Sequence, residues 1–240
     1  MLNLLLQPYL RPMELLDMSK PMLRFVNLNH RYPSGQEVLH NINFSIEPGE
    51  MVFLTGHSGA GKSTLLRLAA LLEKPTKGQV FLNNQCVSSL TSREIPKVRQ
   101  SMGIIFQDPH LLKQQNLYEN VALPLVIAGY RRSEVTRRAR AALQKVNLLS
   151  KALRYPRHIS AGEQIRVSIA RALVTRPTIL LADEPSGNLD PHLSKELLRL
   201  LTQFNDIGMT ILMATHDLAL INHLPYRQLV LRKGYLVNET

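Results

Sequence analysis

The chain has 240 residues, 45% hydrophobic and 20% charged, which supports one compact domain or two small ones. Its 29 basic and 18 acidic residues give a formal net charge of +11, which favours acidic partners such as phosphates, nucleic acid or anionic lipid headgroups. The single cysteine, Cys86, excludes an intrachain disulfide framework. No apolar stretch reaches the roughly 20 residues of a membrane-spanning helix, and the N-terminus lacks the layout of a signal peptide, so we expect a cytosolic chain.

Residues 1–21 contain three prolines and show no steady hydrophobic period. We expect a poorly ordered extension there, with a short membrane-touching amphipathic helix at Met13–Met18 as the alternative.

From residue 22 onward the hydrophobic pattern becomes regular. Strands are predicted, in chain order, at 23–28, 38–46, 51–55, 80–82, 103–106, 178–182 and 209–214. Helices are predicted at 62–73, within 116–175 and at 191–204. Strands that alternate with helices favour a parallel sheet covered on both faces.

A glycine-rich loop lies between the strand predicted at 51–55 and the helix that follows it. Together with the first turn of that helix it comprises Gly56, His57, Ser58, Gly59, Ala60, Gly61, Lys62, Ser63 and Thr64. This run fits the pattern G-x-x-x-x-G-K-[ST], in which glycines let successive backbone N–H groups point at phosphate oxygens. We expect Lys62 to reach the β- and γ-phosphates of a nucleotide and Ser63 to ligate Mg²⁺.

Two carboxylates follow the apolar strand predicted at 178–182. Parallel sheets bind ligands at the carboxyl ends of their strands, so Asp183 is placed to hold Mg²⁺. Glu184, which we expect the following proline to keep extended, is placed to activate an attacking water. His216 follows the strand predicted at 209–214, where contact with a γ-phosphate is favoured over a purely structural role.

A further motif makes the assignment more specific. The run Ile159-Ser160-Ala161-Gly162-Glu163-Gln164, followed by R-V-S-I-A-R-A-L, resembles the signature L-S-G-G-[QE] of ABC-type ATPases. Ser160 and Glu163 also form a capping box, and both interpretations can hold because a capped helix N-terminus attracts anions. The order of further motifs agrees: Tyr32 is similar to the family's adenine-stacking aromatic residue, Gln107 to its Q-loop glutamine and Asp190 to its D-loop aspartate.

The resemblance implies a P-loop NTPase (RecA-like) α/β fold over residues 22–240. It implies a parallel-sheet core, an antiparallel β subdomain and an inserted helical subdomain at approximately 108–171. ATP and Mg²⁺ are the implied cofactors, with Ser63, Gln107 and Asp183 as metal contacts. The signature residues Ser160, Ala161, Gly162 and Glu163 would bind ATP held by the opposite subunit of a homodimer.

Two residues depart from the signature: Ala161 replaces a glycine and Ile165 replaces a usual glutamine. We expect the Cβ of Ala161 to restrict a positive φ and close backbone approach, which predicts slow ATP turnover by the isolated protein.

A narrower resemblance is to the ATPases of bacterial cell division, and His57 is its most telling residue. It also rests on S-R-E-I-P, F-Q-D-P-H-L-L, N-V-A-L-P-L-V-I-A-G and L-M-A-T-H-D. It implies peripheral attachment to the cytoplasmic face of the inner membrane, an FtsX-like integral membrane subunit and coupling to peptidoglycan hydrolysis. The alternative is a lipoprotein-release or macrolide-type exporter ATPase.

A soluble ABC ATPase acting on nucleic acid is the other class of function. It is disfavoured because the interval between Gln107 and Ser160 is short and contains neither sustained heptads nor cysteine. We therefore expect no specific nucleic-acid partner.

The positive charge is concentrated in one region. Residues 108–171 contain 12 basic and 4 acidic residues, which contributes +8 of the total +11. Five arginines lie within 131–140, where a solvated helix face, anionic lipid, an acidic partner and nucleic acid are all possible. Its place in the implied helical subdomain favours the membrane surface.

Overall fold

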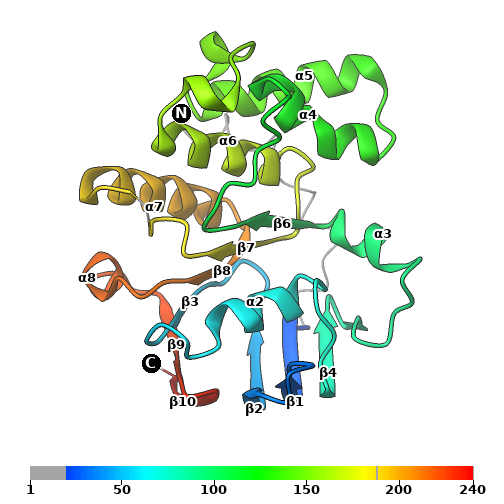
Figure 1. The fold of residues 1–240 in the computed structure, drawn as a ribbon, viewed down its shortest axis with the longest axis vertical. Helices are drawn as coiled ribbons and strands as arrows, with labels where there is room; N and C mark the ends of the chain where they lie inside the picture. The colour runs from blue at the N-terminus through cyan, green and yellow to red at the C-terminus, as the bar shows by residue number, and fades with distance from the viewer. Residues whose placement is uncertain (1–19, 188, 240) are drawn as a thin grey trace.

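The computed structural model describes residues 20–187 and 189–239, in which two sheets and a group of helices form successive layers (Figure 1). The N-terminal extension and the alternative helix at Met13–Met18 lie outside these residues. No described helix is both long enough and apolar enough to cross a membrane.

The smaller sheet is antiparallel, with strand order β2-β1-β4-β5. Its strands are β1 (Leu23–Arg31), β2 (Glu37–Ile46), β4 (Lys77–Leu82) and β5 (Gln85–Cys86). One face is apolar and buried, and the rings of Phe25 and Phe44 stack across β1 and β2 with centroids 4.7 Å apart. The alternation of buried and exposed residues along β1 and β2 reflects a sheet that is packed on one side.

The larger sheet has strand order β10-β9-β3-β8-β7-β6. Its strands are β3 (Met51–Thr55), β6 (Met102–Ile105), β7 (Ile179–Asp183), β8 (Thr210–Ala214), β9 (Arg227–Arg232) and β10 (Tyr235–Glu239). All neighbouring strands are parallel except β9 and β10, which form an antiparallel hairpin at one edge. This arrangement confirms the predicted α/β class with a parallel core and a separate antiparallel sheet.

Both faces of the larger sheet are buried. Along β3, Met51 and Phe53 face a core shared with α4 to α7, whereas Val52 and Leu54 face a core shared with α2 and the smaller sheet. Every residue of β3 and β8 is buried as a result, which explains their continuous apolar sequences.

The helices divide between these two faces. On the face of the smaller sheet lies α2 (Lys62–Ala69). On the opposite face pack α4 (Leu117–Ile127), α5 (Arg132–Lys145), α6 (Ala161–Leu173) and α7 (Pro191–Asp206). Two 3₁₀ turns (Leu149–Lys151 and Pro156–His158) join α5 to α6, and the short helices α3 (Ile95–Arg99) and α8 (Leu218–Ile221) complete the described elements.

Glycine at position 78 is required by sterics, which a substitution can test. Gly78 has φ +84°, and a Cβ there would lie 2.3 Å from the carbonyl oxygen of Asn27 in β1. Gly35 has a similar φ of +87° with no heavy atom within 4 Å of its Cβ position, so it is a matched control. Gly35→Ala should cost about 1 kcal/mol of stability from backbone strain alone. Gly78→Ala should cost an additional ~2–3 kcal/mol because the backbone of β1 must move. Urea unfolding measures both, and equal midpoints for the two variants would contradict this account.

Candidate functional site

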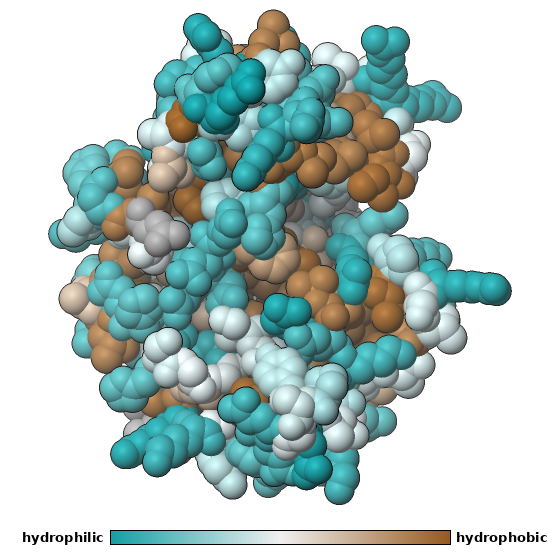
Figure 2. Space-filling view, viewed as in Figure 1, coloured by the Kyte–Doolittle hydropathy of each residue, from teal (hydrophilic) through white to brown (hydrophobic). Residues whose placement is uncertain are grey.

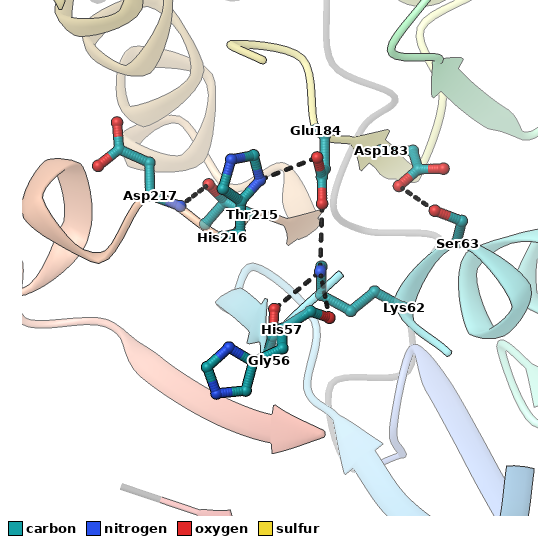
Figure 3. Close-up of polar contacts among 9 residues, drawn as sticks. All are labelled: Gly56, His57, Lys62, Ser63, Asp183, Glu184, Thr215, His216 and Asp217. Carbon is teal, nitrogen blue, oxygen red and sulfur yellow. Dashed lines mark hydrogen bonds and ion pairs between the residues drawn. The ribbon is translucent and has the colours of Figure 1, made fainter. Parts of the chain in front are cut away.

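The candidate site lies where three neighbouring parallel strands end. In the order β3-β8-β7, the glycine loop follows β3, His216 follows β8 and Asp183 ends β7. Because parallel strands end at the same edge of a sheet, these segments converge there. Figure 3 shows the resulting cluster of side chains.

The loop itself depends on glycine. Gly56, Gly59 and Gly61 have φ values of +141°, +78° and +109°. A Cβ on Gly56 would lie 2.1 Å from the carbonyl oxygen of Leu231 in β9, which excludes any side chain. The loop closes on itself through a hydrogen bond of 3.1 Å from the Ala60 N–H to the His57 carbonyl. His57 and Ser58 are exposed, and Figure 3 shows the His57 ring pointing away from Glu184.

Lys62 is the first residue of α2, and its ammonium group is surrounded by oxygen atoms. The side chain is only 4% exposed. Its Nζ donates to the carbonyl oxygens of Gly56 at 2.8 Å and His57 at 3.3 Å. It also forms an ion pair of 3.1 Å with Oε1 of Glu184. A buried ammonium needs such partners, and a phosphate entering the loop would offer it further anionic oxygens.

The Glu184 carboxylate joins Lys62 to His216. Its second oxygen, Oε2, lies 2.9 Å from Nδ1 of His216. The Glu184 side chain is 16% exposed and that of His216 is 59% exposed, so the pair borders the solvent. Both oxygens of the carboxylate are thus fixed in position, which suits a group that must orient a water molecule.

The expectation that Glu184 is extended is wrong. Its φ is +44°, in the left-handed region, although proline follows it. Its N–H donates to the carbonyl oxygen of Ala214 in β8 at 3.0 Å, so pairing with the neighbouring strand overrides the local preference. A non-glycine residue in this conformation costs on the order of 1–3 kcal/mol, and such strain is common at functional sites.

Asp183 and Ser63 form the second polar pair of the site. The Ser63 hydroxyl donates to Oδ1 of Asp183 at 3.0 Å. Burial raises the pKa of the Asp183 carboxyl above its usual range; the Ser63 hydrogen bond opposes this rise and the nearby charge of Glu184 adds to it. A hydroxyl and a carboxylate are the hard oxygen donors that Mg²⁺ prefers, so the pair fits this ion. In residues 20–187 and 189–239 no group of three or more His, Cys, Asp or Glu side chains could hold a metal alone.

Tyr32 lies at this site in the structure, whereas Gln107 lies apart from Ser63 and Asp183. The Tyr32 hydroxyl lies 2.9 Å from Oγ1 of Thr64 in α2, and the ring of His30 packs against it edge-on. Gln107 is exposed after β6, with its amide nitrogen facing Gly187. In the described part of the chain, no hydrogen bond joins Gln107 to Ser63 or Asp183.

The signature residues begin α6, on the opposite face of the larger sheet from α2. Ser160 caps the helix: its hydroxyl accepts from the Glu163 N–H at 3.3 Å, and its own N–H donates to the Glu163 carboxylate at 3.0 Å. Lys151 pairs with that carboxylate at 2.5 Å. In this chain the signature therefore does not contact the glycine loop, and Figure 1 shows α2 and α6 well separated.

One expectation about the signature is wrong. Ala161 is the first residue of α6 and is not among the residues with positive φ, so its Cβ does not strain the backbone. At the neighbouring Gly162 a Cβ would lie 2.9 Å from Cδ1 of Leu193, so that leucine side chain would have to shift. The predicted slowing of ATP turnover by Ala161 would therefore have to arise from its Cβ limiting the close approach of a ligand.

Asp190 caps α7 beside this contact. Its Oδ1 accepts the N–H groups of His192 and Leu193 at 2.9 and 3.0 Å. Because Leu193 lies beside Gly162, the starts of α6 and α7 are next to each other.

Two residues that sequence reasoning missed hold the loop after Gln107. Arg171 of α6 donates to the carbonyl oxygens of His110 at 2.9 Å and Pro109 at 2.6 Å. Asn120 of α4 is fully buried, and its side chain bonds both the N–H and the carbonyl of Leu112. A polar residue inside the apolar run of α4 was a usable signal for Asn120, whereas nothing local marks Arg171.

Comparison with known proteins gives consistent matches. A family model described as "ABC transporter" matches residues 39–187. The "Cell division ATP-binding protein FtsE" of Escherichia coli K12 is 50% identical over 215 residues, covering 90% of this chain and 97% of that protein. The Bacillus subtilis protein of the same name is 40% identical over 218 residues, covering 91% and 96%. A dimeric ATP-binding cassette, solved in a post-hydrolysis state with ADP and Pi, superposes with a TM-score of 0.84 at 34% identity, covering 91% of this chain and 98% of that one.

The capping box of α6 gives a prediction about pH. The hydrogen bond from Lys151 lowers the pKa of Glu163 below its usual range, so the ionised carboxylate stabilises the fold above the unfolded pKa. Glu163→Gln should cost about 1 kcal/mol at neutral pH. This difference should begin to shrink as the pH falls below the unfolded pKa of about 4.3 and should disappear only below the lowered folded pKa, where the wild-type carboxyl is protonated in both states. Urea unfolding at neutral and acid pH measures it, with Glu47→Gln at an exposed turn as the control. A deficit that persists unchanged in acid would contradict the assigned role of the charge.

Proposed function

The chain belongs to the ABC transporter family of ATP-binding cassettes, and we propose that it is the ATPase subunit of a bacterial cell-division complex. It binds and hydrolyses ATP. The observation that carries the cell-division role is the match to the E. coli and B. subtilis cell-division proteins, which spans nearly the whole of each chain. A lipoprotein-release or macrolide-type exporter is not favoured by these relatives.

The geometry supports the following roles in hydrolysis. The glycine loop and Lys62 hold the β- and γ-phosphates of ATP, while Tyr32, fixed to Thr64, offers its ring to adenine. Glu184 accepts the proton of the attacking water, and His216 positions that carboxylate through the contact of 2.9 Å. When ATP draws Lys62 toward its phosphates, Glu184 loses a competing partner and becomes free to bind water.

A metal contact accompanies these steps. Ser63 and Asp183 would hold Mg²⁺, with Gln107 as a further metal contact. Bound there, the ion would supply positive charge to neutralise the phosphate oxygens.

The position of the signature supports a homodimer. Within one chain α2 and α6 lie on opposite faces of the larger sheet, so one copy cannot enclose ATP between the glycine loop and the signature. Two copies arranged head to tail place Ser160, Ala161, Gly162 and Glu163 of one against the γ-phosphate held by the other, where the N-terminus of α6 favours negative charge. Asp190, at the start of α7 beside the signature, would lie at the same interface between the two copies. A similar cassette has been solved as a dimer.

A groove in the helical region supports docking of a membrane subunit. A cavity of about 870 Å³ lies between the loop after Gln107 and the segment before α6. It is lined by Asp108, His110, Leu111, Lys113, Gln114, Tyr155, Pro156, Arg157 and Gln164. Nearby Leu153 is 78% exposed. We assign this groove to an FtsX-like integral membrane subunit, which would hold the protein on the cytoplasmic face of the inner membrane and couple dimer closure to peptidoglycan remodelling.

Replacement of the proposed base tests the hydrolytic mechanism. Glu184→Gln keeps the side-chain shape but removes the proton acceptor, so ATP hydrolysis should fall by at least about 100-fold. The ATP-bound dimer should accumulate. Phosphate release and light scattering measure the two effects, with Glu47→Gln at an exposed turn as the control. A Glu184→Gln protein that stays monomeric with excess Mg-ATP and hydrolyses at the wild-type rate would refute the mechanism.

Co-purification tests the cell-division role. The tagged wild-type chain, extracted from its own bacterium in mild detergent, should retain an integral membrane subunit of the FtsX type. Leu153→Asp, two residues before the groove-lining Tyr155, should reduce this recovery at least about tenfold, because a carboxylate would be buried in the interface. Leu218→Asp, at an exposed position on α8, should not. Recovery of an exporter permease instead would favour the alternative function.

A further inference from the structure

The five arginines of 131–140 differ in the partners that their side chains contact. Arg138 is only 15% exposed and is already engaged: its guanidinium stacks 4.5 Å above the Tyr130 ring and pairs with Glu134 at 2.5 Å. Arg137 lies at a longer 3.7 Å from the same carboxylate. Glu134 is the only acidic residue of the segment, so it can neutralise little else.

The positive charges of the other three arginines are not balanced by a carboxylate among the described residues. Arg131, Arg132 and Arg140 are exposed, and none of the described carboxylates forms an ion pair with them. Arg176, in the turn before β7, adds a further cation. Burial lowers its pKa, and the charges of Arg138 and Arg137 lower it further. Crowding of like charges on one surface costs free energy unless an anionic partner compensates it.

Apolar side chains project beside these arginines. Val126 and Ile127, in the last turn of α4, are 59% and 68% exposed. They are separated from Arg131 only by the turn at Gly129, whose φ is +76°. Figure 2 shows apolar side chains at the right-hand end of α4 and α5, with long hydrophilic side chains projecting next to them. We name Val126, Ile127, Arg131 and Arg132 the turn patch.

We propose that the turn patch binds a membrane surface containing anionic phospholipids. Arginines contact the headgroups while the two aliphatic side chains insert at the boundary of the acyl chains, a combination typical of interfacial anchors. The patch is a projecting turn, so it suits a planar lipid surface better than a peptide. Beside it lies a cavity of about 250 Å³, lined by Gln100, Ala128, Gly129, Tyr130 and Thr175, that leaves room for a headgroup.

This inference rests on the proposed function, because a membrane-bound partner is what would bring the chain to the lipid. It adds a second contact, separate from the groove, that would fix the orientation of the ATPase relative to the membrane.

Vesicle sedimentation tests the proposal with the full-length protein. Wild type should bind vesicles of phosphatidylcholine mixed with phosphatidylglycerol and should bind phosphatidylcholine alone much more weakly. Arg131→Ala/Arg132→Ala should lower the partition coefficient on the anionic vesicles about 25-fold, at roughly fivefold for each arginine. Val126→Ser/Ile127→Ser should lower it severalfold. Lys195→Ala/Arg199→Ala on α7 removes the same charge at the other side of the molecule in Figure 1 and should have little effect.

The outcomes separate this proposal from the proposed function. Equal losses for the turn-patch and α7 variants, or equal binding to both vesicle types, would overturn the lipid assignment. The arginine variant should still co-purify with the integral membrane subunit in detergent. Loss of that co-purification would show that the patch binds protein instead, whereas failure of the wild type to co-purify would count against the proposed function itself.

Discussion

The ion pair between Lys62 and Glu184 is the contact on which the site depends. It connects the first residue of α2, which follows β3, to the residue that follows β7, at the carboxyl ends of these parallel strands. An ammonium that is 4% exposed requires anionic or carbonyl oxygens around it. The curled glycine loop supplies two of these oxygens and Glu184 supplies the third. The parallel strands β3, β8 and β7 must therefore be in correct register to bring these groups within bonding distance.

The chemistry of the site could be predicted from sequence because its signals are local. The glycine loop, the carboxylates ending β7 and the histidine after β8 each follow an apolar strand, and parallel strands end at one edge. The conformation of Glu184 could not be predicted in this way, because a hydrogen bond to Ala214 on a neighbouring strand sets it and overrides the local preference. Ala161 is a different case. The capping box of Ser160 and Glu163 is a local signal for the start of α6, and it already implies a helical conformation at Ala161.

Elements at the edges of the fold were also missed. The hairpin of β9 and β10 has Arg232 and Lys233 at its turn and the half-exposed Tyr235 just beyond it, so its hydrophobic alternation is weak. Yet β9 pairs with β3, and its Leu231 carbonyl is the atom that restricts position 56 to glycine. A strand with a faint sequence signal thus imposes a strong constraint on the most recognisable motif of the chain.

The bonds from Arg171 and Asn120 to the loop after Gln107 have a mechanical consequence. The loop is attached to α6 through its first residues and to α4 through Leu112, so few of its backbone torsions can change independently. A flexible loop would respond to a small displacement by changing its own conformation. A stiff loop instead moves the helices to which it is bonded. A displacement of this loop would therefore be passed on to both α4 and α6, the two helices to which it is bonded.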